Sequence, residues 1–310
     1  MSAESAFIES LRALATHRAA RRLLDDAAVL EVGGATLVLT HDMLVEGVHF
    51  LSDDPPQDVA WKLLAVNLSD LAAKGARPLG VLLGFPLGDE AWDRAFVEGL
   101  GMALAAFGIP LLGGDTATGP RVLGLTAIGE AAGPVPSRSG AKPADRLWVS
   151  GTIGDAGAGL RLLRGKLPDA PALVERYRTP RPRLELGQAL APLVSAMTDV
   201  SDGLLIDAKR MAAASAAALE IALDAIPLSD AFLSALGDDR DRRLAAATAG
   251  DDYELLFAAA PERSHELLGL ADRFGIPLTP IGTFAAGAGL SLTDASEPVS
   301  LPPRLGWEHG

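Results

Sequence analysis

Short apolar runs alternate along the chain with longer segments whose apolar residues recur every three or four positions. The first pattern is typical of buried strands and the second of helices that pack on one side. Their alternation predicts an α/β or α+β protein. The predicted strands are 36–40, 81–85, 122–129, 146–150, 220–226, 254–260 and 278–284; the predicted helices are 4–15, 58–74, 91–107, 156–164, 184–196, 203–219 and 264–274.

The chain is long enough for two domains, since it has 310 residues and a domain has roughly 150. Prolines and glycines cluster in the segment 133–144, GPVPSRSGAKPA, between two predicted strands. We therefore expect one domain at 1–134 and a second at 135–310. A shorter proline-rich piece at 177–183, YRTPRPR, is interpreted as a basic loop before a helix, with its arginines mainly solvated.

Composition excludes several classes of protein. The 27 basic and 40 acidic side chains give a net charge of −13, which argues against a broad electrostatic grip on nucleic acid or anionic lipid. No apolar run approaches the roughly 18 residues that span a bilayer, and the first residues lack the apolar core of a signal peptide, so we expect a cytoplasmic protein. The absence of cysteine excludes disulfides, thiolate metal sites and cysteine nucleophiles. The five histidines show no metal-binding spacing, so any bound metal should prefer oxygen ligands.

Aspartates recur where apolar segments end. Asp25 and Asp26 precede one such segment, and Asp42 follows the predicted strand 36–40. Each could be an ordinary turn residue. Asp70 lies near the end of a helix that is apolar on nearly every side, and an ion pair with Lys74 would contribute only about 0.3–0.5 kcal/mol. Because the helix dipole disfavours a carboxylate there, a buried Asp70 would require a cation.

Three further acidic clusters occur later in the chain. The GGDT segment at 113–116 could cradle a phosphate or form a simple tight turn. The DVSDG segment at 199–203 precedes a helix, where one residue could be a cap, but three acceptors exceed that need. An acidic doublet, Asp251 and Asp252, opens a predicted strand.

Carboxylates in this number, without cysteine or a histidine cage, fit a site for several Mg²⁺ ions that bridge to substrate phosphates. The pattern therefore indicates nucleotide-dependent phosphoryl transfer. Neither a Walker loop nor the protein-kinase motifs occur, so we expect a nucleotide to be held mainly through metal.

In chain order, the segments LLDDAAVL, LTHDMLVEGVHF, VNLSDLAAKGARP, LLGGDT, SRSGAKPAD, VSGTIGDAGAGL, TDVSDGLL and AGDDYELLF resemble the thiamine-monophosphate kinase family. That family belongs to the superfamily of aminoimidazole ribonucleotide synthetase. The resemblance implies an N-terminal α/β domain that dimerises through its sheet and a C-terminal α/β domain. It also implies ATP-dependent phosphorylation of thiamine monophosphate to thiamine diphosphate. Because the acceptor phosphate is mostly dianionic at pH 7 and Mg²⁺ ions would screen its repulsion from ATP, we expect direct in-line transfer without a phosphoenzyme or a general base.

The resemblance also assigns site residues. Metal binding falls on Asp26, Thr40, His41, Asp42, Asp70, Asp115, Asp199 and Asp202, with His41 able to serve through its backbone carbonyl. ATP binding falls on Gly114, Asp115, Arg138 and Ser201. Substrate binding falls on His49, Asp251 and Trp307, where an aromatic face would suit a cationic thiazolium ring.

The chain departs from the family pattern at Leu24, His41, Ala249 and Asp251, while the metal carboxylates are kept. Several rival hypotheses remain, and among them the hydrogenase-maturation relative and the purine synthetase of the same superfamily fit LVEGVHF and GDDYELLF together less well. A selenophosphate synthetase shares the aspartates but normally uses an N-terminal cysteine or selenocysteine, which this chain lacks. A non-catalytic nucleotide-binding protein would explain the departures, and binding of ATP without turnover would favour it.

Overall fold

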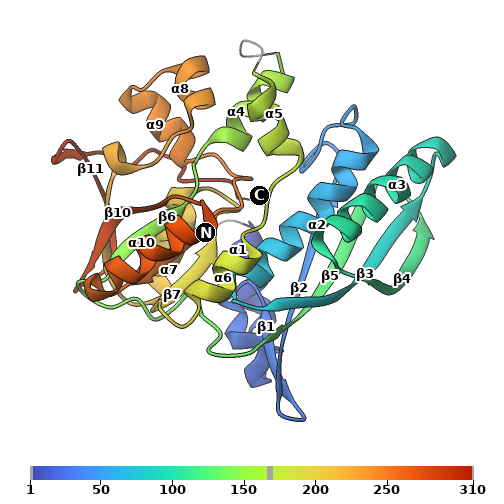
Figure 1. The fold of residues 1–310 in the computed structure, drawn as a ribbon, viewed down its shortest axis with the longest axis horizontal. Helices are drawn as coiled ribbons and strands as arrows, with labels where there is room; N and C mark the ends of the chain where they lie inside the picture. Colours follow the sequence, from blue (N-terminus) through green and yellow to red (C-terminus); the bar gives the residue numbers. More distant parts are fainter. Residues whose placement is uncertain (1–2, 166–169, 309–310) are drawn as a thin grey trace.

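Two β-sheets, one from each half of the chain, form the framework of the protein (Figure 1). The computed structural model describes residues 3–165 and 170–308. The predicted α/β class with two domains is confirmed. The position of the boundary near residue 134 stays a prediction, although the first sheet ends at residue 131 and the second begins at 146.

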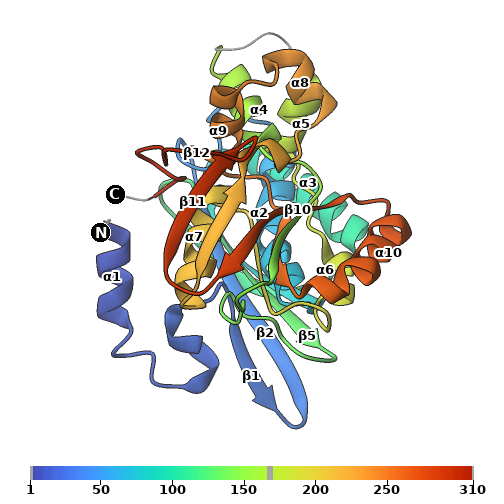
Figure 2. The same cartoon turned by 90° about the vertical axis from the view of Figure 1, so that its left-hand side faces the viewer.

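The first sheet has the strand order β1-β2-β5-β3-β4. Its strands are β1 (Ala28–Val32), β2 (Ala35–Val45), β3 (Arg77–Leu87), β4 (Leu111–Thr118) and β5 (Val122–Ala131). β3 and β4 are parallel and the other neighbours are antiparallel. Helices α2 (Pro56–Ala73) and α3 (Glu90–Phe107) cover one face, and α1 (Ala3–Leu11) stands away from the sheets (Figure 2).

The second sheet has the order β12-β11-β8-β10-β6-β9-β7. Its strands are β6 (Arg146–Ser150), β7 (Ala196–Asp199), β8 (Ala218–Ala222), β9 (Leu255–Ala259), β10 (Leu278–Ala285), β11 (Gly289–Asp294) and β12 (Glu297–Val299). The helices of this half are α4 (Asp155–Leu163), α5 (Pro171–Arg178), α6 (Leu184–Leu190), α7 (Leu204–Ala214), α8 (Asp230–Leu236), α9 (Arg240–Ala247) and α10 (Ser264–Phe274). Apolar side chains of α7 pack in one core, whereas those of α6 and α10 pack in another.

Helix α2 belongs to both halves. Leu63, Leu64 and Leu68 lie in the core of the first sheet, while Ala72 and Ala73 lie in a core of the second. Helix α6 approaches α2 so closely that a Cβ atom on Gly187 would lie 2.0 Å from the carbonyl oxygen of Ala72. A helix buried on all sides explains why this segment is apolar at nearly every position. Its few polar residues therefore lie at the seam between the two sheets.

The predicted elements differ from the observed ones mainly at their ends. The helix expected over 203–219 ends at Ala214, and Ala218–Ala222 forms β8 instead, because pairing with β10 and β11 overrides the helical preference of alanine. The helix expected over 184–196 ends at Leu190. The sequence did not predict β1, β4, β7, β11, β12, α5, α8 and α9.

Candidate active site

Carboxylates from three distant segments meet at the seam between the two sheets. Asp26 precedes β1, Asp70 lies in the last turn of α2, and Asp199 ends β7. One oxygen from each of these three side chains lies within 4.8 Å of the others. The fold therefore brings together three of the predicted metal-binding residues, which are up to 173 positions apart in the chain.

Burial and mutual repulsion disfavour the charged forms of these carboxylates. Burial raises the pKa of Asp70 well above its ordinary value, and the nearby charges of Asp42 and Asp199 add to this. Burial likewise raises the pKa of Asp199 to about 8 and that of Asp42 to about 6. Carboxylates that repel one another in a buried site form a donor set for a hard divalent cation, because such an ion takes oxygen ligands and offsets their charge.

Hydrogen bonds orient two of these carboxylates and fix the backbone of a third residue. The hydroxyl of Thr40 donates to Asp70, and the hydroxyl of Ser69 donates to Asp199. Asp42 is held through its backbone, whose amide donates to Asn67 Oδ1 at 3.0 Å. Thr40 thus lies within the cluster, as the sequence predicted.

Two cations flank Asp26. Burial alone would raise the pKa of Asp26, but the charges of Arg138 and Lys74 outweigh it and lower the pKa below the ordinary value. Lys74 Nζ lies 2.9 Å from Asp26 Oδ2, and Arg138 pairs with the other oxygen. Among the described residues, the buried Nε atom of Arg138 has no hydrogen-bond acceptor. A buried donor without a protein partner fits a guanidinium whose further acceptor is an anionic ligand.

Asp202 lies in a loop whose shape depends on Asp207. The cap at the start of α7 is Gly203, which has no side chain to bond the helix, so the interpretation of this segment as a helix cap is wrong. Instead the carboxylate of Asp207 accepts hydrogen bonds from the amides of Ser201 and Asp202, at 3.2 and 3.1 Å. Arg210 pairs with both Asp202 and Asp207.

Two of the three proposed substrate residues, Asp251 and Trp307, contact this loop through their backbones. The amide of Asp251 donates to the Ser201 carbonyl at 2.8 Å, and the amide of Trp307 donates to the Asp202 carbonyl at 2.8 Å. His49 accepts at Nδ1 from the amide of Val45 at 2.9 Å, which leaves its proton on Nε2 in the neutral ring.

Gly114 and Asp115 do not join the cluster within one chain. They lie on β4, which is exposed along its whole length, and two strands separate β4 from the strand that carries Asp42. At about 4.8 Å per strand step, these strands are about 14 Å apart. The paired glycines serve the sheet itself, since a Cβ on Gly114 would lie 1.9 Å from the Leu83 carbonyl oxygen.

The side chain of His41 faces away from the cluster. Successive side chains of a strand point to opposite faces, and His41 bonds to Thr126 Oγ1 at 2.9 Å on the exposed face of the first sheet. The metal-binding role suggested for His41 through its backbone carbonyl stays a prediction.

Both halves of the chain match known sequence families. Residues 24–131 match the sequence family described as AIR synthase related protein, N-terminal domain, and residues 142–295 match its C-terminal domain. Two curated thiamine-monophosphate kinases are similar over most of the chain. The one from Caulobacter vibrioides is 44% identical over 93% of this chain and 85% of its own length, and the one from Salmonella typhimurium is 41% identical over 92% and 90%.

The chain belongs to the thiamine-monophosphate kinase family. The predicted family and the predicted class of enzyme are thus confirmed. Among solved structures, a thiamine-monophosphate kinase from Stenotrophomonas maltophilia K279a has a TM-score of 0.78 and 40% identity over 96% of this chain and 98% of that one. A structure described as AaThiL complexed with AMPPCP and TMP has a TM-score of 0.85 and 28% identity over 98% and 96%.

The fold accommodates two of the departures from the family pattern. Leu24, in place of the family's glycine, has φ −109°, a value that any residue adopts. The methyl group of Ala249 packs against Gly157 of α4. A Cβ atom on this glycine would lie 2.3 Å from the Ala249 Cβ. Neither position is strained by its substitution.

Sequence reasoning missed the residues that hold the carboxylates in place. Thr198, for example, donates to Asp26 Oδ2 at 3.0 Å, and the buried Lys62 contacts both His49 and Asp251. The signal available for those on α2 was the presence of polar residues in a helix that is otherwise apolar. The residues of this kind that the sequence did not point to are Lys62, Ser69, Thr198, Asp207 and Arg210.

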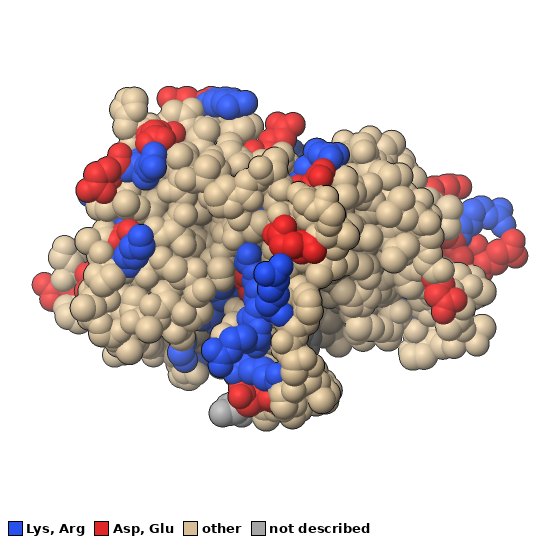
Figure 3. Space-filling model, turned by 90° about the horizontal axis from the view of Figure 1, so that it is seen from below, with Lys and Arg blue, Asp and Glu red and all other residues tan. Residues whose placement is uncertain are grey.

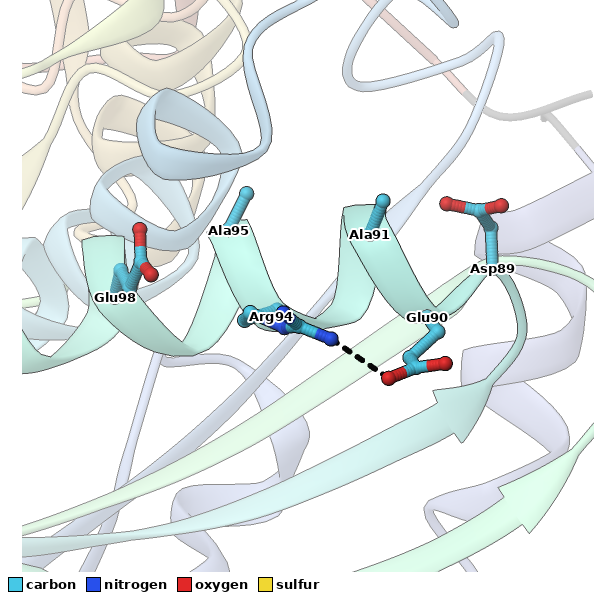
Figure 4. Close-up of a pocket in the computed structure, with 6 residues that line it drawn as sticks. All are labelled: Asp89, Glu90, Ala91, Arg94, Ala95 and Glu98. Atoms are coloured by element: carbon cyan, nitrogen blue, oxygen red, sulfur yellow. Dashed lines mark hydrogen bonds and ion pairs between the residues drawn. The ribbon is translucent and has the colours of Figure 1, made fainter.

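Other surface features lie apart from these residues. A shallow depression on α3 is lined by Asp89, Glu90, Ala91, Arg94, Ala95 and Glu98, and Arg94 pairs with Glu90 within it (Figure 4). No predicted site residue lines it. Figure 3 shows Lys and Arg side chains gathered in a band on one face of a protein whose net charge is −13. In the described part of the chain, no helix is long and apolar enough to span a membrane.

Proposed function

We propose that the protein transfers the γ-phosphoryl group of ATP to the phosphate of thiamine monophosphate, giving thiamine diphosphate. The observation that carries this proposal is the meeting of Asp26, Asp70 and Asp199 at the seam of the two sheets. The AaThiL structure, whose fold this chain shares, holds an ATP analogue and TMP. We further propose that the reaction requires Mg²⁺ and proceeds by direct in-line attack.

Asp26, Asp42, Asp70 and Asp199 would hold the Mg²⁺ ions, with Asp202 and the backbone near His41 at the edge of the site. When bound, these ions supply charge neutralisation between two phosphates inside an acidic protein. The requirement is strict because the described side chains around Asp70 provide a hydroxyl and further carboxylates but no ammonium or guanidinium partner.

The protein's own groups orient the reactants. Arg138 would contact phosphate oxygens through Nε, the donor that lacks an acceptor. Ser201 and the Asp202 loop, kept in shape by Asp207, would contact the nucleotide. His49, Asp251 and Trp307 would contact thiamine monophosphate. The acceptor phosphate has a second pKa near 6 and is mostly dianionic at pH 7, so no general base is needed.

We also propose that the enzyme is a homodimer joined through the first sheet. The outer face of this sheet carries His41, Met43, Leu82, Leu112 and Thr126. The apolar residues of this set are largely exposed, Met43 by 50%, Leu82 by 39% and Leu112 by 55%. Exposed apolar groups on a sheet face indicate a surface that another molecule covers. We assign Gly114 and Asp115 of the partner subunit to the site, because these residues do not reach the cluster within their own chain. The location of the protein in the cytoplasm stays a prediction.

The test is a coupled assay for ADP and thiamine diphosphate from purified protein, ATP and thiamine monophosphate. Product should form with Mg²⁺, and it should be absent in EDTA or when free thiamine replaces the monophosphate. Binding of ATP without any product would overturn the proposal and favour a non-catalytic nucleotide-binding protein.

A further inference from the structure

Lys62 lies on α2 at the seam between the two sheets, and its side chain is only 2% exposed. Its ammonium group is 2.9 Å from Asp251 Oδ2 and 3.0 Å from the His49 carbonyl oxygen. A buried ammonium is tolerated only with such partners. These two partners come from different halves of the chain.

Aromatic groups complete the surroundings of this ammonium. The ring of Tyr177 lies 3.9 Å from Lys62 Nζ, a cation–π contact in a buried setting. The hydroxyl of Tyr253 donates to Asp251 Oδ1 at 3.1 Å, so both oxygens of that carboxylate are engaged. Asp251 and Tyr253 also have positive φ values of 70° and 51°, which the surrounding contacts must maintain. The arrangement therefore fixes the position of Asp251 closely.

The two partners of Lys62 are both groups to which we assign contact with thiamine monophosphate. We propose that Lys62 is a positioning residue that holds the His49 loop and the Asp251 carboxylate at one fixed separation, and so shapes the binding site for this substrate. This inference rests on the proposed function. Lys62 touches no carboxylate of the metal cluster in the described contacts, so its effect should be confined to the thiamine substrate.

A purely structural role makes a different prediction. Removal of the buried ammonium leaves Asp251 without its cation, so the free energy of unfolding falls whether Lys62 has a structural or a positioning role. Only a positioning role changes the affinity for thiamine monophosphate without changing that for ATP. The neighbouring residue offers a matched control, because Trp61 Nε1 donates to the Pro180 carbonyl at 2.9 Å and so also links α2 to the second half of the chain.

The experiment compares wild type, Lys62→Met and Trp61→Phe, with Lys62→Gln as a second variant if Lys62→Met does not fold. Calorimetry would measure binding of thiamine monophosphate and, separately, of a non-hydrolysable ATP analogue with Mg²⁺. Steady-state assays would give KM and kcat, and thermal unfolding would report Tm.

We expect Lys62→Met to weaken binding of thiamine monophosphate by at least about tenfold, which corresponds to about 1.4 kcal/mol. Its KM for this substrate should rise far more than kcat falls, and the affinity for the ATP analogue should stay within about twofold of wild type. Trp61→Phe should lower Tm but leave both affinities unchanged. Unchanged binding of thiamine monophosphate in the folded Lys62 variant would overturn the inference, and so would an equal loss for both ligands. A wild type that binds no thiamine monophosphate would instead overturn the proposed function.

Discussion

The ammonium group of Lys74 lies 2.9 Å from Asp26, which is 48 residues away, rather than pairing with Asp70 one helical turn before it. Its other partners are Asp25 and the Met197 carbonyl oxygen. Lys74 is fully buried, so this choice of partner matters for the whole cluster. It leaves Asp70 with a hydroxyl donor and with neighbouring carboxylates that repel it.

Replacement of this carboxylate should therefore separate stability from activity. We expect Asp70→Asn to lower kcat by at least about 10²-fold. The variant loses a ligand of Mg²⁺, and with it the ion that would neutralise charge on the reacting phosphates. The same variant should unfold at a higher temperature than wild type in EDTA, since a repelling buried charge is gone. Assays and thermal unfolding of Asp70→Asn beside the exposed Asp272→Asn provide the test. A folded Asp70→Asn enzyme with wild-type rates would refute the role of Asp70.

Stability without metal should depend on pH in a defined direction. The folded-state pKa values of Asp42 and Asp199 are raised from an ordinary value of 3.8 to about 6 and about 8. The folded state thus binds these protons more tightly than the unfolded chain, and the stability they contribute is complete below pH about 4 and lost as the pH rises through 6 and 8.

In EDTA we therefore expect Tm to fall as the pH rises from 5 to 8.5. Mg²⁺ binds the deprotonated carboxylates, so the increase in Tm that it causes should be larger at pH 8.5 than at pH 5. Asp199→Asn isolates the contribution of one group and should flatten the dependence measured in EDTA. A Tm that rises over this interval would contradict the electrostatic description of the cluster.

Glu254 tests the interior of the second half. Its side chain is 0% exposed and accepts from Arg176 at 2.8 Å, from Arg183, and from Ser150 at 2.6 Å. Glu254→Gln removes the buried charge that pairs with two partly buried guanidinium groups, and it should cost about 3–5 kcal/mol of unfolding free energy.

The matched control is Glu175→Gln, which disrupts an ion pair with Arg181 whose side chains are 57% and 65% exposed. Exposed pairs contribute about 0–1 kcal/mol, so denaturant titrations should show little change. Equal losses in the two variants would mean that burial of Glu254 does not determine its contribution.

The sequence identified the carboxylates but not what holds them. Asp70 could be recognised because a charge in an apolar helix is conspicuous, and the family motifs gave Asp26, Asp42 and Asp199 their order. The partner of Lys74 could not be predicted, since pairing at helical spacing is the only interaction a linear pattern displays. The basic loop shows the same limit. Arg181 is exposed as expected, whereas Arg178 pairs with the buried Asp54 at 2.8 Å, a contact that depends on how the two halves pack.

The separation of Asp115 from Asp42 leads to the last prediction. If the site needs both residues, and β4 lies about 14 Å from β2 within one chain, then Asp115 must act in the site of a second copy. Asp70→Asn and Asp115→Asn should each be inactive alone. In a heterodimer of the two variants, one of the two sites combines an intact Asp70 with an intact Asp115 from the other subunit.

Random exchange of equal amounts puts half of the dimers in the mixed form, with one working site in each. Mixing should thus restore about a quarter of wild-type activity after subunit exchange or co-expression. Light scattering of each variant establishes that the dimer forms. The control is a mixture of the Asp70→Asn and Asp199→Asn variants, which should stay inactive because both residues belong to the cluster of one chain. No recovery in the first mixture, with dimers present, would show that Asp115 acts within its own chain or not at all.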